Sequence, residues 1–328
     1  CERVHVICLR EGEHDLPANV TVHSLGKPYS AASNAAVKGA GKRLQARLLY
    51  IVKFYRYMWT LRKEYDAVFV HMNPEYVVLG GPWWRLWGKR IGLWYVHSSV
   101  TRILKLAVKL TDIIFTTSAE SFRIESPKVR IMGHGIPVAL FMPRAAQWQG
   151  ELRIMTVGRV SRTKRIYEMM QALDELHRRG VEFRFIIVGA PATQSDFEYK
   201  KFLTTEIAKR PYVVVQAGAI THRELPHVLA EADLFINLSG TQSMDKAVLE
   251  SFASGVPVVS SNRAFRLVLE QYGLFCADNE PATIADAIDW YIKRSDRESV
   301  RTALRAYVEK EHSLSRLIPA IMQEYVRT

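Results

Sequence analysis

The chain of 328 residues contains only three cysteines, and neither they nor its ten histidines are spaced as metal ligands. Cys1, Cys8 and Cys276 form no Cys-x-x-Cys pair, so neither a zinc site nor a disulfide framework is expected, and a reducing compartment fits. The sequence also contains no His-Glu-x-x-His and no Asp-x-Asp, a pattern that can hold a metal-bound diphosphate. It therefore predicts that neither a metal nor another cofactor is bound.

Long apolar segments are absent as well. No run approaches the roughly 18 apolar residues that a membrane-spanning helix needs, and no signal peptide is recognisable. Hydrophobic residues make up 48% of the chain and charged residues 24%, which is ordinary for soluble globular proteins, and the length favours two domains over one. These features predict a cytoplasmic protein.

Acidic residues are scarce in the first half of the chain. Residues 1–145 contain 21 Lys and Arg against 10 Asp and Glu, whereas residues 146–328 contain 24 against 23. Between Asp15 and Glu64 there is no acidic residue but there are nine basic ones. This asymmetry predicts that a face of the first half meets an anionic partner.

The second half alternates between strand and helix patterns, which predicts a doubly wound parallel sheet. The expected strands are 152–158, 183–189, 212–217, 233–239, 257–261 and 273–276. Helices are expected at 166–179, near 196–209, after a capping box at Thr221–Glu224, and around Glu250.

The first half is also of the α/β class but less complete. Strands are expected at 4–9, 20–25, 67–71, 91–96, 113–118 and 129–132, with a long helix at 41–63. We expect an N-terminal domain at 1–145, a linker at 142–150, a C-terminal domain at 146–311, and a last helix at 312–328 that packs back on the first domain. The first strand lacks a glycine-rich turn, so about one βα unit of this domain is predicted to be missing.

The segment Gly158-Arg-Val-Ser-Arg-Thr-Lys164 follows a predicted strand and precedes a predicted helix. A diphosphate gains negative charge as it leaves a sugar, and fixed cations stabilise that charge. Arg159 and Lys164, five residues apart across the turn, are predicted to converge on one diphosphate. The alternative is that both are solvated loop charges.

A second strand–loop–helix unit runs from the strand at 233–239 through Gln242 to a helix that carries Glu250 and stops at Gly255. Such a unit places backbone N–H groups and a helix N-terminus at the carboxyl end of a parallel sheet, where α/β folds hold anionic ligands. Glu250 offers an acceptor suited to a sugar diol. The alternative is a surface carboxylate in the first turns of a helix.

Together these segments resemble the family-4 retaining glycosyltransferases, also called glycosyltransferase group 1. Gly-Arg-x-x-x-x-Lys is similar to that family's donor-diphosphate motif, and the Glu250 segment is similar to its Glu-x7-Glu motif, with Gln242 in place of the first Glu. The resemblance implies a donor site in which Glu250 binds the ribose and the other members approach the diphosphate or the transferred sugar. These other members are Gly158, Arg159, Lys164, Gln242, Ser243, Met244 and Asp245.

The resemblance also suggests catalytic residues. Gln242 offers no negative charge near a developing oxocarbenium ion, and Asp245 is predicted to substitute in part. His97 ends a predicted strand and resembles the family's histidine that contacts the donor sugar and phosphates; a core histidine is the alternative. His71 has a similar placement, and His134 lies in a segment that resembles the interdomain crossover, where a structural role is expected.

The predicted helix at 41–63 places one set of residues on one face, namely Leu44, Leu48, Val52, Tyr55 and Trp59, and Arg43, Arg47 and Arg56 on or beside another. A core-packed helix with a solvated rim is the first interpretation. The alternative is a surface on the inner face of an anionic membrane, because aromatic residues among cations suit a bilayer edge. Nucleic acid is not expected as a partner, since no nucleic-acid-binding motif accompanies the charge.

The resemblance implies the GT-B fold, in which two facing Rossmann-like domains enclose the donor in a cleft. It also implies retaining, metal-independent transfer of a hexose from a UDP or GDP sugar to a hydroxyl acceptor, as in bacterial-type glycolipid or polysaccharide assembly. A lipid-linked and a soluble acceptor remain alternatives. So do two other functions: a non-catalytic relative that binds nucleotide sugar, and a GT-B-fold epimerase of nucleotide sugars.

Overall fold

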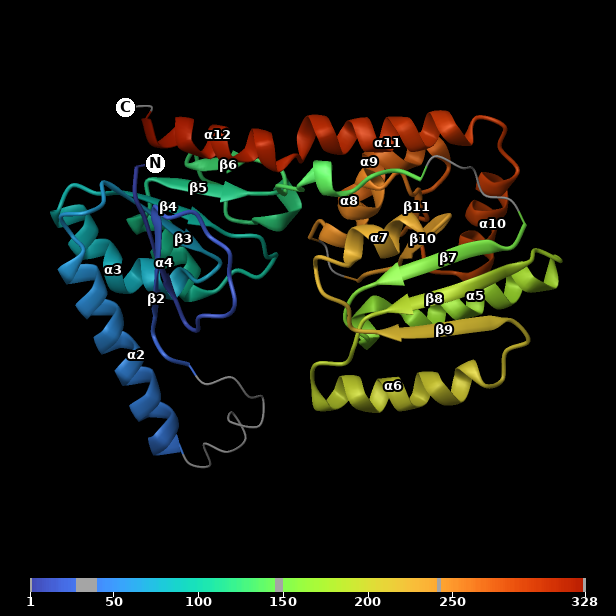
Figure 1. The fold of residues 1–328 in the computed structure, drawn as a ribbon, viewed down its shortest axis with the longest axis horizontal. Helices are drawn as coiled ribbons and strands as arrows, with labels where there is room; N and C mark the ends of the chain where they lie inside the picture. Colours follow the sequence, from blue (N-terminus) through green and yellow to red (C-terminus); the bar gives the residue numbers. More distant parts are fainter. Residues whose placement is uncertain (1, 28–39, 145–149, 241–242, 327–328) are drawn as a thin grey trace. The chain divides into compact units, whose positions relative to one another are not determined.

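A computed structural model describes residues 2–27, 40–144, 150–240 and 243–326, which form two compact α/β units (Figure 1). The first unit comprises Cys1–Tyr95, Val100–Ile114 and Ser126–Val129, and the second comprises Val96–Ser99, Phe115–Glu125 and Arg130–Thr328. The domain boundaries predicted at 145–146 and 311–312 stay predictions, and the first of them falls in the segment 145–149, outside the described residues.

All six strands predicted in the first half are found, each within two residues of its expected ends. Two form a parallel pair, β1 (Val4–Cys8) and β2 (Val20–Ser24). The other four form a sheet in the order β3 (Ala67–His71), β4 (Arg90–Trp94), β5 (Ile113–Thr116) and β6 (Val129–Ile131). The helices are α2 (Ala40–Thr60), α3 (Pro74–Leu86) and α4 (Arg102–Leu110). No described helix is both long enough and apolar enough to cross a membrane.

Helix α2 contradicts the first interpretation of its apolar face. It packs inward through Phe54 and Met58, which are almost fully buried. Phe54 contacts the rings of Tyr76 and Trp84 of α3, with centroids 4.9 and 6.0 Å apart. On the predicted face, Leu48, Val52 and Trp59 are instead exposed, whereas Tyr55 is half-buried and its hydroxyl donates to the Leu79 carbonyl at 3.0 Å. The helix therefore has two apolar faces, and the one that carries Phe54 and Met58 is inside.

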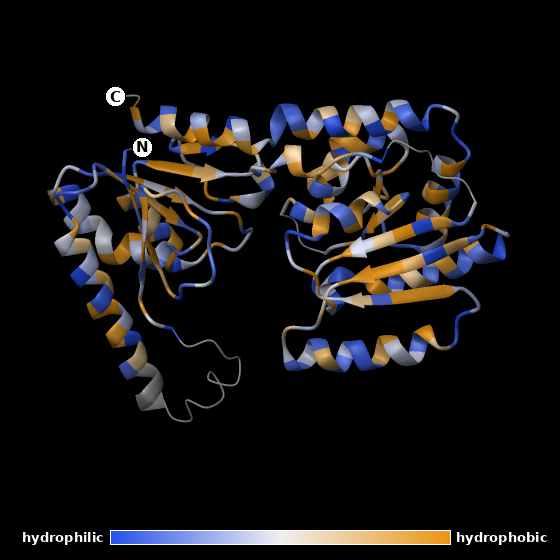
Figure 2. Ribbon diagram, in the orientation of Figure 1, coloured by the Kyte–Doolittle hydropathy of each residue, from blue (hydrophilic) through white to orange (hydrophobic). Residues whose placement is uncertain are grey.

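The second unit is built on five parallel strands whose residues are mostly hydrophobic (Figure 2). Their order in the sheet is β11 (Val258–Ser260), β10 (Leu234–Asn237), β7 (Leu152–Val157), β8 (Phe183–Val188) and β9 (Val213–Gly218). This confirms the predicted doubly wound sheet. The strand expected at 273–276 forms only a single bridge, between Ser260 and Phe275.

The helices of the second unit also follow the predicted alternation. They are α5 (Ile166–Arg178), α6 (Gln194–Ile207), α7 (Leu225–Ala230), α8 (Lys246–Ala253), α9 (Arg266–Leu269), α10 (Pro281–Ile292), α11 (Arg297–Glu311) and α12 (Leu314–Val326). Short 3-10 turns lie at Ala119–Ser121, Val138–Leu140, Arg162–Lys164, Arg263–Phe265 and Glu270–Tyr272.

Two local contacts show how these helices are placed. The predicted capping box before α7 is present, because Glu224 accepts from the Thr221 N–H at 2.7 Å while Thr221 Oγ1 accepts from the Glu224 N–H at 3.3 Å. The last helix, α12, returns to strands far back in the sequence: Arg130 Nε donates to Glu324 at 3.0 Å, and the rings of Phe115 and Tyr325 are 5.9 Å apart.

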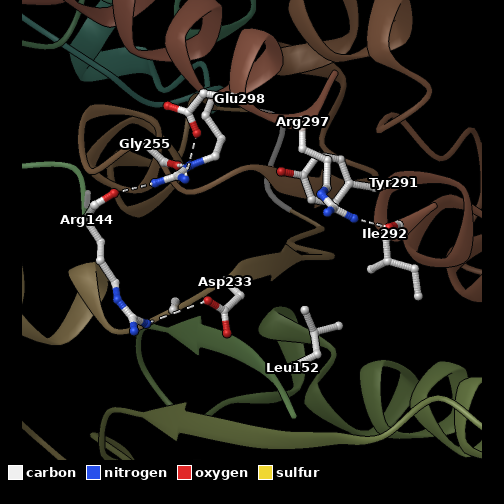
Figure 3. A pocket seen from close by; sticks show the side chains of 10 residues that line it. Arg144, Leu152, Asp233, Gly255, Tyr291, Ile292, Arg297 and Glu298 are labelled. Carbon is white, nitrogen blue, oxygen red and sulfur yellow. Dashed lines mark hydrogen bonds and ion pairs between the residues drawn. The ribbon is translucent and has the colours of Figure 1, made fainter. Parts of the chain in front are cut away.

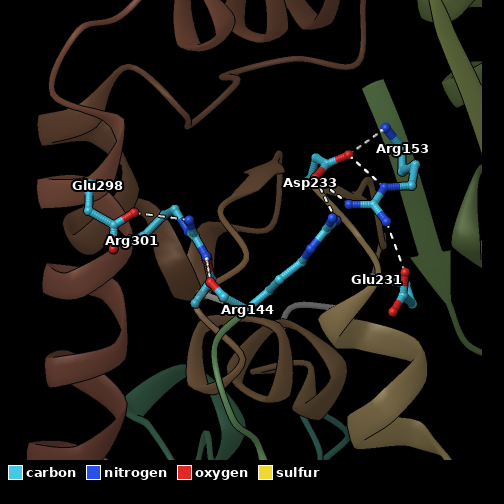
Figure 4. Close-up of polar contacts among 7 residues, drawn as sticks. Arg144, Arg153, Glu231, Asp233, Glu298 and Arg301 are labelled. Atoms are coloured by element: carbon cyan, nitrogen blue, oxygen red, sulfur yellow. Dashed lines mark hydrogen bonds and ion pairs between the residues drawn. The ribbon is translucent and has the colours of Figure 1, made fainter. Parts of the chain in front are cut away.

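A buried ion pair ties the starts of the two central strands β7 and β10 together (Figure 4). Arg153 Nε and Nη2 donate to the two carboxylate oxygens of Asp233 at 2.9 and 2.8 Å, and the Arg153 N–H donates to the same carboxylate at 2.9 Å. The Asp233 hydrogen bonds raise the pKa of Arg153. Glu231 also accepts from Arg153, at 2.9 Å, but its side chain is 68% exposed, against 7% for Asp233.

Removing the buried carboxylate should therefore cost far more than removing the exposed one. We expect Asp233→Ala to lower the free energy of unfolding by about 3 kcal/mol, because it leaves a guanidinium and a backbone N–H without their buried partner. Glu231→Ala, the matched control, should cost about 0.5 kcal/mol or less. Thermal and urea unfolding measure both, and equal losses in the two variants would contradict this account of the strand pairing.

Candidate functional site

The sequence-predicted donor residues lie on two loops at the carboxyl edge of the second sheet. From β7 the chain adds β8 and β9 on one side, then crosses back to add β10 and β11 on the other. The loops that leave β7 and β10 therefore flank the point where the strand order reverses, the usual ligand position in doubly wound sheets. They touch through the Gly240 N–H, which donates to the Thr163 carbonyl at 3.1 Å.

Two glycines allow backbone segments to approach closely at this edge of the sheet. Gly158, directly after β7, has a φ of +146°, and a Cβ there would meet Lys164 Cε at 3.0 Å. Gly189, directly after β8, has a φ of +141°, and a Cβ there would lie 1.8 Å from the Gly158 carbonyl oxygen. Any side chain at Gly189 would push the loop after β7 out of place.

The predicted diphosphate cations each have an acidic partner. Lys164 forms an ion pair with Asp245, whose carboxylate also accepts from Asn237 Nδ2 at 3.0 Å and from the Ala247 N–H at 3.3 Å. Asp245 thus caps the N-terminus of α8 and fixes Lys164 at the same time. Arg159 is half exposed and lies 3.7 Å from Asp196. The convergence of Arg159 and Lys164 on one diphosphate stays a prediction.

Glu250 is buried inside α8 and contacts the side chains of a histidine and a lysine. Its Oε1 lies 3.1 Å from His222 Nε2 and 3.4 Å from Lys246 Nζ. Burial raises the pKa of Glu250, while the charges of Lys246 and His222 oppose that shift. The alternative of a surface carboxylate is therefore wrong. His222, from the loop between β9 and α7, was not identified from the sequence, because nothing in its local pattern distinguishes it.

The loop before α8 is held from both sides. Asn262 Nδ2 donates to the Ser243 carbonyl at 3.0 Å, and Met244 is buried. His134 is hydrogen-bonded to the backbone of Met244, so the crossover segment props the predicted sugar-binding loop. This contact agrees with a structural role for His134. Gln242 lies outside the described residues.

His97 is exposed, which removes the core-histidine alternative. Its Nδ1 accepts from the Ser99 N–H at 3.0 Å, which leaves the proton on Nε2. The His97 N–H donates to the Ser121 carbonyl at 2.9 Å, so the backbone is fixed as well. His97 therefore presents an N–H donor, and its contact with a donor sugar stays a prediction. His71 lies parallel to the Trp94 ring at 6.5 Å.

A cavity of about 30 Å³ lies elsewhere, at the opposite edge of the second sheet (Figure 3). It is lined by residues that precede or begin strands, including Leu152, Asp233 and Gly255. Arg144 reaches Asp233 at 4.0 Å, and Arg301 Nη2 donates to the Arg144 carbonyl at 3.0 Å. Parallel sheets hold ligands at their carboxyl ends, so this cavity is not the donor site. Among the described residues, no group of three His, Cys, Asp or Glu is placed to hold a metal ion.

Comparison with known proteins agrees with the strand order and the loops. The family description "Glycosyl transferases group 1" matches residues 151–294. This match agrees with the predicted resemblance to glycosyltransferase group 1. A GDP-mannose-dependent alpha-(1-6)-phosphatidylinositol dimannoside mannosyltransferase of Mycobacterium tuberculosis is 28% identical over 214 residues, covering 61% of this chain and 54% of its own. A glycogen synthase of the same organism is 26% identical over 196 residues, with coverages of 55% and 45%.

The chain is also similar in fold to solved structures. The Anabaena protein HepE, in complex with UDP and glucose, matches with a TM-score of 0.72 at 14% identity, covering 94% of this chain and 86% of its own. The predicted α/β class and GT-B fold are thereby confirmed. The chain spans about half the length of the curated relatives that it matches.

The fold around His312, close to the crossover segment that supports the predicted sugar-binding loop, should lose stability in acid. His312 is buried between α11 and α12, its Nε2 lies 2.9 Å from the Tyr307 hydroxyl, and its carbonyl accepts from the Ile136 N–H at 2.6 Å. Burial, with a smaller contribution from His134, lowers the pKa of His312 to about 4. Among the described side chains, His312 Nδ1 is buried without a hydrogen-bond partner.

We expect this histidine to destabilise the fold as pH falls from 6.5 to 4. In that window the unfolded chain binds a proton at His312 and the folded chain does not, so about 3 kcal/mol of stability is lost progressively. His312→Gln should flatten the pH dependence of the unfolding midpoint over this range. His227→Gln, which changes an exposed histidine, should keep the wild-type curve, and superimposable curves for all three proteins would disprove the assignment.

Proposed function

We propose that the chain is a hexosyltransferase that moves a sugar from a nucleotide diphosphate sugar to a hydroxyl acceptor, with retention of anomeric configuration and without a metal. One observation carries the proposal: Lys164, Asp245 and the N-terminus of α8 come together where the strand order of a group 1 glycosyltransferase domain reverses. A fixed cation and a helix N-terminus at that place suit a diphosphate.

The partners of Lys164 suit electrostatic catalysis. Because Asp245 already holds the ammonium group, little reorganisation is needed when charge develops on a departing diphosphate. Arg159, half exposed on the same loop, would supply the second cation. The paired carboxylate of Asp245 adds a positioning role to the catalytic role predicted for it. The departing phosphate would itself accept the acceptor's proton, so the proposal needs no dedicated base.

Glu250 supplies the nucleotide end of the site in this proposal. Its carboxylate would accept hydrogen bonds from the ribose hydroxyls, while the backbone of Ser243, Met244 and Asp245 would meet the sugar. The relatives support a UDP or a GDP donor: one is described as GDP-mannose-dependent, and HepE was solved with UDP. Gln242 and His97 would complete the sugar end. A lipid-linked and a soluble hydroxyl acceptor remain alternatives.

The test is incubation with UDP-glucose or GDP-mannose labelled in the sugar, in the presence of a chelator and of octyl glycosides as hydroxyl acceptors. We expect label in the acceptor with the anomeric configuration of the donor. Label in an epimerised donor would establish the epimerase instead, and bound but unconverted donor would establish a non-catalytic relative. Either result would overturn the proposal.

The loop after β7 gives the matching variants. Arg159→Ala and Lys164→Ala should each lower turnover by about a hundredfold, because each removes a cation aimed at the leaving diphosphate. Lys164→Ala should also lower the unfolding midpoint, since Asp245 loses its ion pair, and adding Asp245→Asn should restore stability but not turnover. Arg162→Ala, a cation of the same loop that stacks on Tyr199 at 5.3 Å, is the control and should keep the wild-type rate.

Variants of Glu250 and Gln242 should show that the first residue binds the nucleotide end of the donor and the second binds the sugar end. Glu250→Gln should weaken binding of free nucleoside diphosphate by roughly 1–3 kcal/mol, because a carboxylate acceptor is lost. Gln242→Ala should weaken the sugar-nucleotide and leave the free diphosphate unchanged. Calorimetric titration with both ligands measures this. Identical effects of the two variants would show that the ends are wrongly assigned.

The Glu250→Gln change should weaken nucleotide binding without lowering the stability of the fold. A carboxyl whose pKa is raised in the fold contributes stability below its unfolded pKa and loses it as pH rises through the folded pKa. At neutral pH the Glu250→Gln protein should therefore melt no lower than the wild type. A marked drop in its midpoint would indicate a structural role for the carboxylate rather than a binding role.

A further inference from the structure

Three of the seven tryptophans gather on the surface of the first unit. Trp59, at the end of α2, meets Trp83 and Trp87 at the end of α3, with ring centroids 5.4 and 5.2 Å away. Trp59 and Trp83 are exposed, and Leu86 between the two α3 tryptophans is 74% exposed. We call Trp59, Trp83, Leu86 and Trp87 the tryptophan surface. Single exposed apolar residues are ordinary, but a contiguous aromatic cluster marks a binding surface.

Exposed apolar residues of α2, the helix that ends beside Trp59, extend this surface along the helix. Leu48, Val52 and Trp59 are separated by four and seven residues, so they share one face, and all three are exposed. Val52 alone is 66% exposed. Since Phe54 and Met58 bury the opposite face, the helix is already anchored without this outer stripe.

Cations are interleaved with the exposed apolar residues. Arg56 lies four residues after Val52 and three before Trp59, so it borders their face, and it is exposed. The Arg62 guanidinium lies 5.5 Å from the centre of the Trp59 ring. Directly after Trp87, an open hollow is lined by Arg85, Gly88, Lys89, Arg90 and Asp112, and Asp112 is paired with Arg85 at 3.2 Å.

We propose that the tryptophan surface and the outer face of α2 dock on an anionic phospholipid bilayer. Tryptophan prefers the boundary between hydrocarbon and headgroups, and exposed Leu and Val side chains reach the acyl region. Arg56, Arg62 and the cations of the hollow meet lipid phosphates, while their aliphatic stems stay with the apolar groups. Residues 1–145, which carry this surface, contain 21 basic against 10 acidic residues, and this excess of positive charge complements an extended anionic lipid surface.

The proposal is independent of sugar transfer. The tryptophan surface lies in the first unit and includes no residue assigned to the donor site. A protein that transfers sugar without binding vesicles would refute the docking surface alone, and one that binds vesicles without transferring sugar would refute the transferase alone. Docking would favour a lipid-linked acceptor over a soluble one.

The experiment is co-sedimentation of the full chain with vesicles of phosphatidylcholine alone or mixed with phosphatidylglycerol, at low and high salt. We expect binding to the mixed vesicles only, weakened by salt that shortens the screening length to a few ångströms. Arg56→Gln should weaken it about fivefold, as expected for one cation near an anionic leaflet. Leu86→Ser should weaken it about tenfold, since a leucine side chain no longer leaves water.

Matched variants from the second unit control for general surface effects. Leu267→Ser changes a leucine that is 90% exposed, and Trp290→Ser is compared with Trp83→Ser because both tryptophans are exposed. Neither control should alter vesicle binding. Circular dichroism checks that each variant folds. Leu86 is the most exposed residue of the tryptophan surface, so Leu86→Ser still tests the proposal if a tryptophan variant fails to fold.

Three results would overturn the proposal. The first is equal binding to neutral and anionic vesicles, or binding to neither. The second is a loss in the Leu267→Ser or Trp290→Ser control that equals the loss in its partner. The third is a concentration-dependent dimer, detected by light scattering, that Leu86→Ser abolishes, which would assign the surface to a second copy of the chain.

Discussion

Strand β7 lies in the middle of the second sheet. From it the chain forms β8 and β9 on one side, and then crosses back to form β10 and β11 on the other side. Every residue proposed to bind the diphosphate depends on that reversal. It sends the loops after β7 and β10 to the same edge from opposite directions, so that side chains 81 residues apart, Lys164 and Asp245, form an ion pair. Glycines at 158 and 189 allow the backbones to meet at this edge without a side chain between them.

The charges at this edge are balanced differently at its two ends. The carboxylate of Asp245 accepts hydrogen bonds from an ammonium group, an amide and a backbone N–H, and these contacts stabilise the loop. Glu250 is buried, with His222 and Lys246 beside its Oε1, and burial raises its pKa. Burying a carboxylate costs stability, which is typical of a binding group rather than of a stabilising one. The cap and the cation fix the loop, and the costlier carboxylate remains available to a ligand.

Sequence patterns predicted the elements and the motif-bearing loops because those depend on local periodicity and on turns at Gly158 and Gly255. They did not predict the pairs that join distant segments. Neither His222 beside Glu250 nor Asn262 beside Ser243 carries a local signal, since the sheet order alone decides which loops meet. Helix α2 shows a second limit. Both Val52 and Phe54 fit a helical stripe, and periodicity identifies apolar faces without showing which one the neighbouring helix buries.

The uneven distribution of charge along the chain fits two different anionic partners, the proposed donor diphosphate and the proposed lipid surface. The proposed donor site would meet a diphosphate with individual cations, each paired with a carboxylate, in a half of the chain that is nearly neutral, with 24 basic against 23 acidic residues. Such pairs act over a few ångströms and produce little field beyond a screening length of about 10 Å. The excess of 21 basic over 10 acidic residues lies in residues 1–145, where tryptophans and leucines are exposed beside it. A field of that sign attracts an extended anionic surface to this half and not to the donor site. The charge distribution therefore favours attraction of a large anionic surface to the first half of the chain and binding of a small diphosphate in the second half.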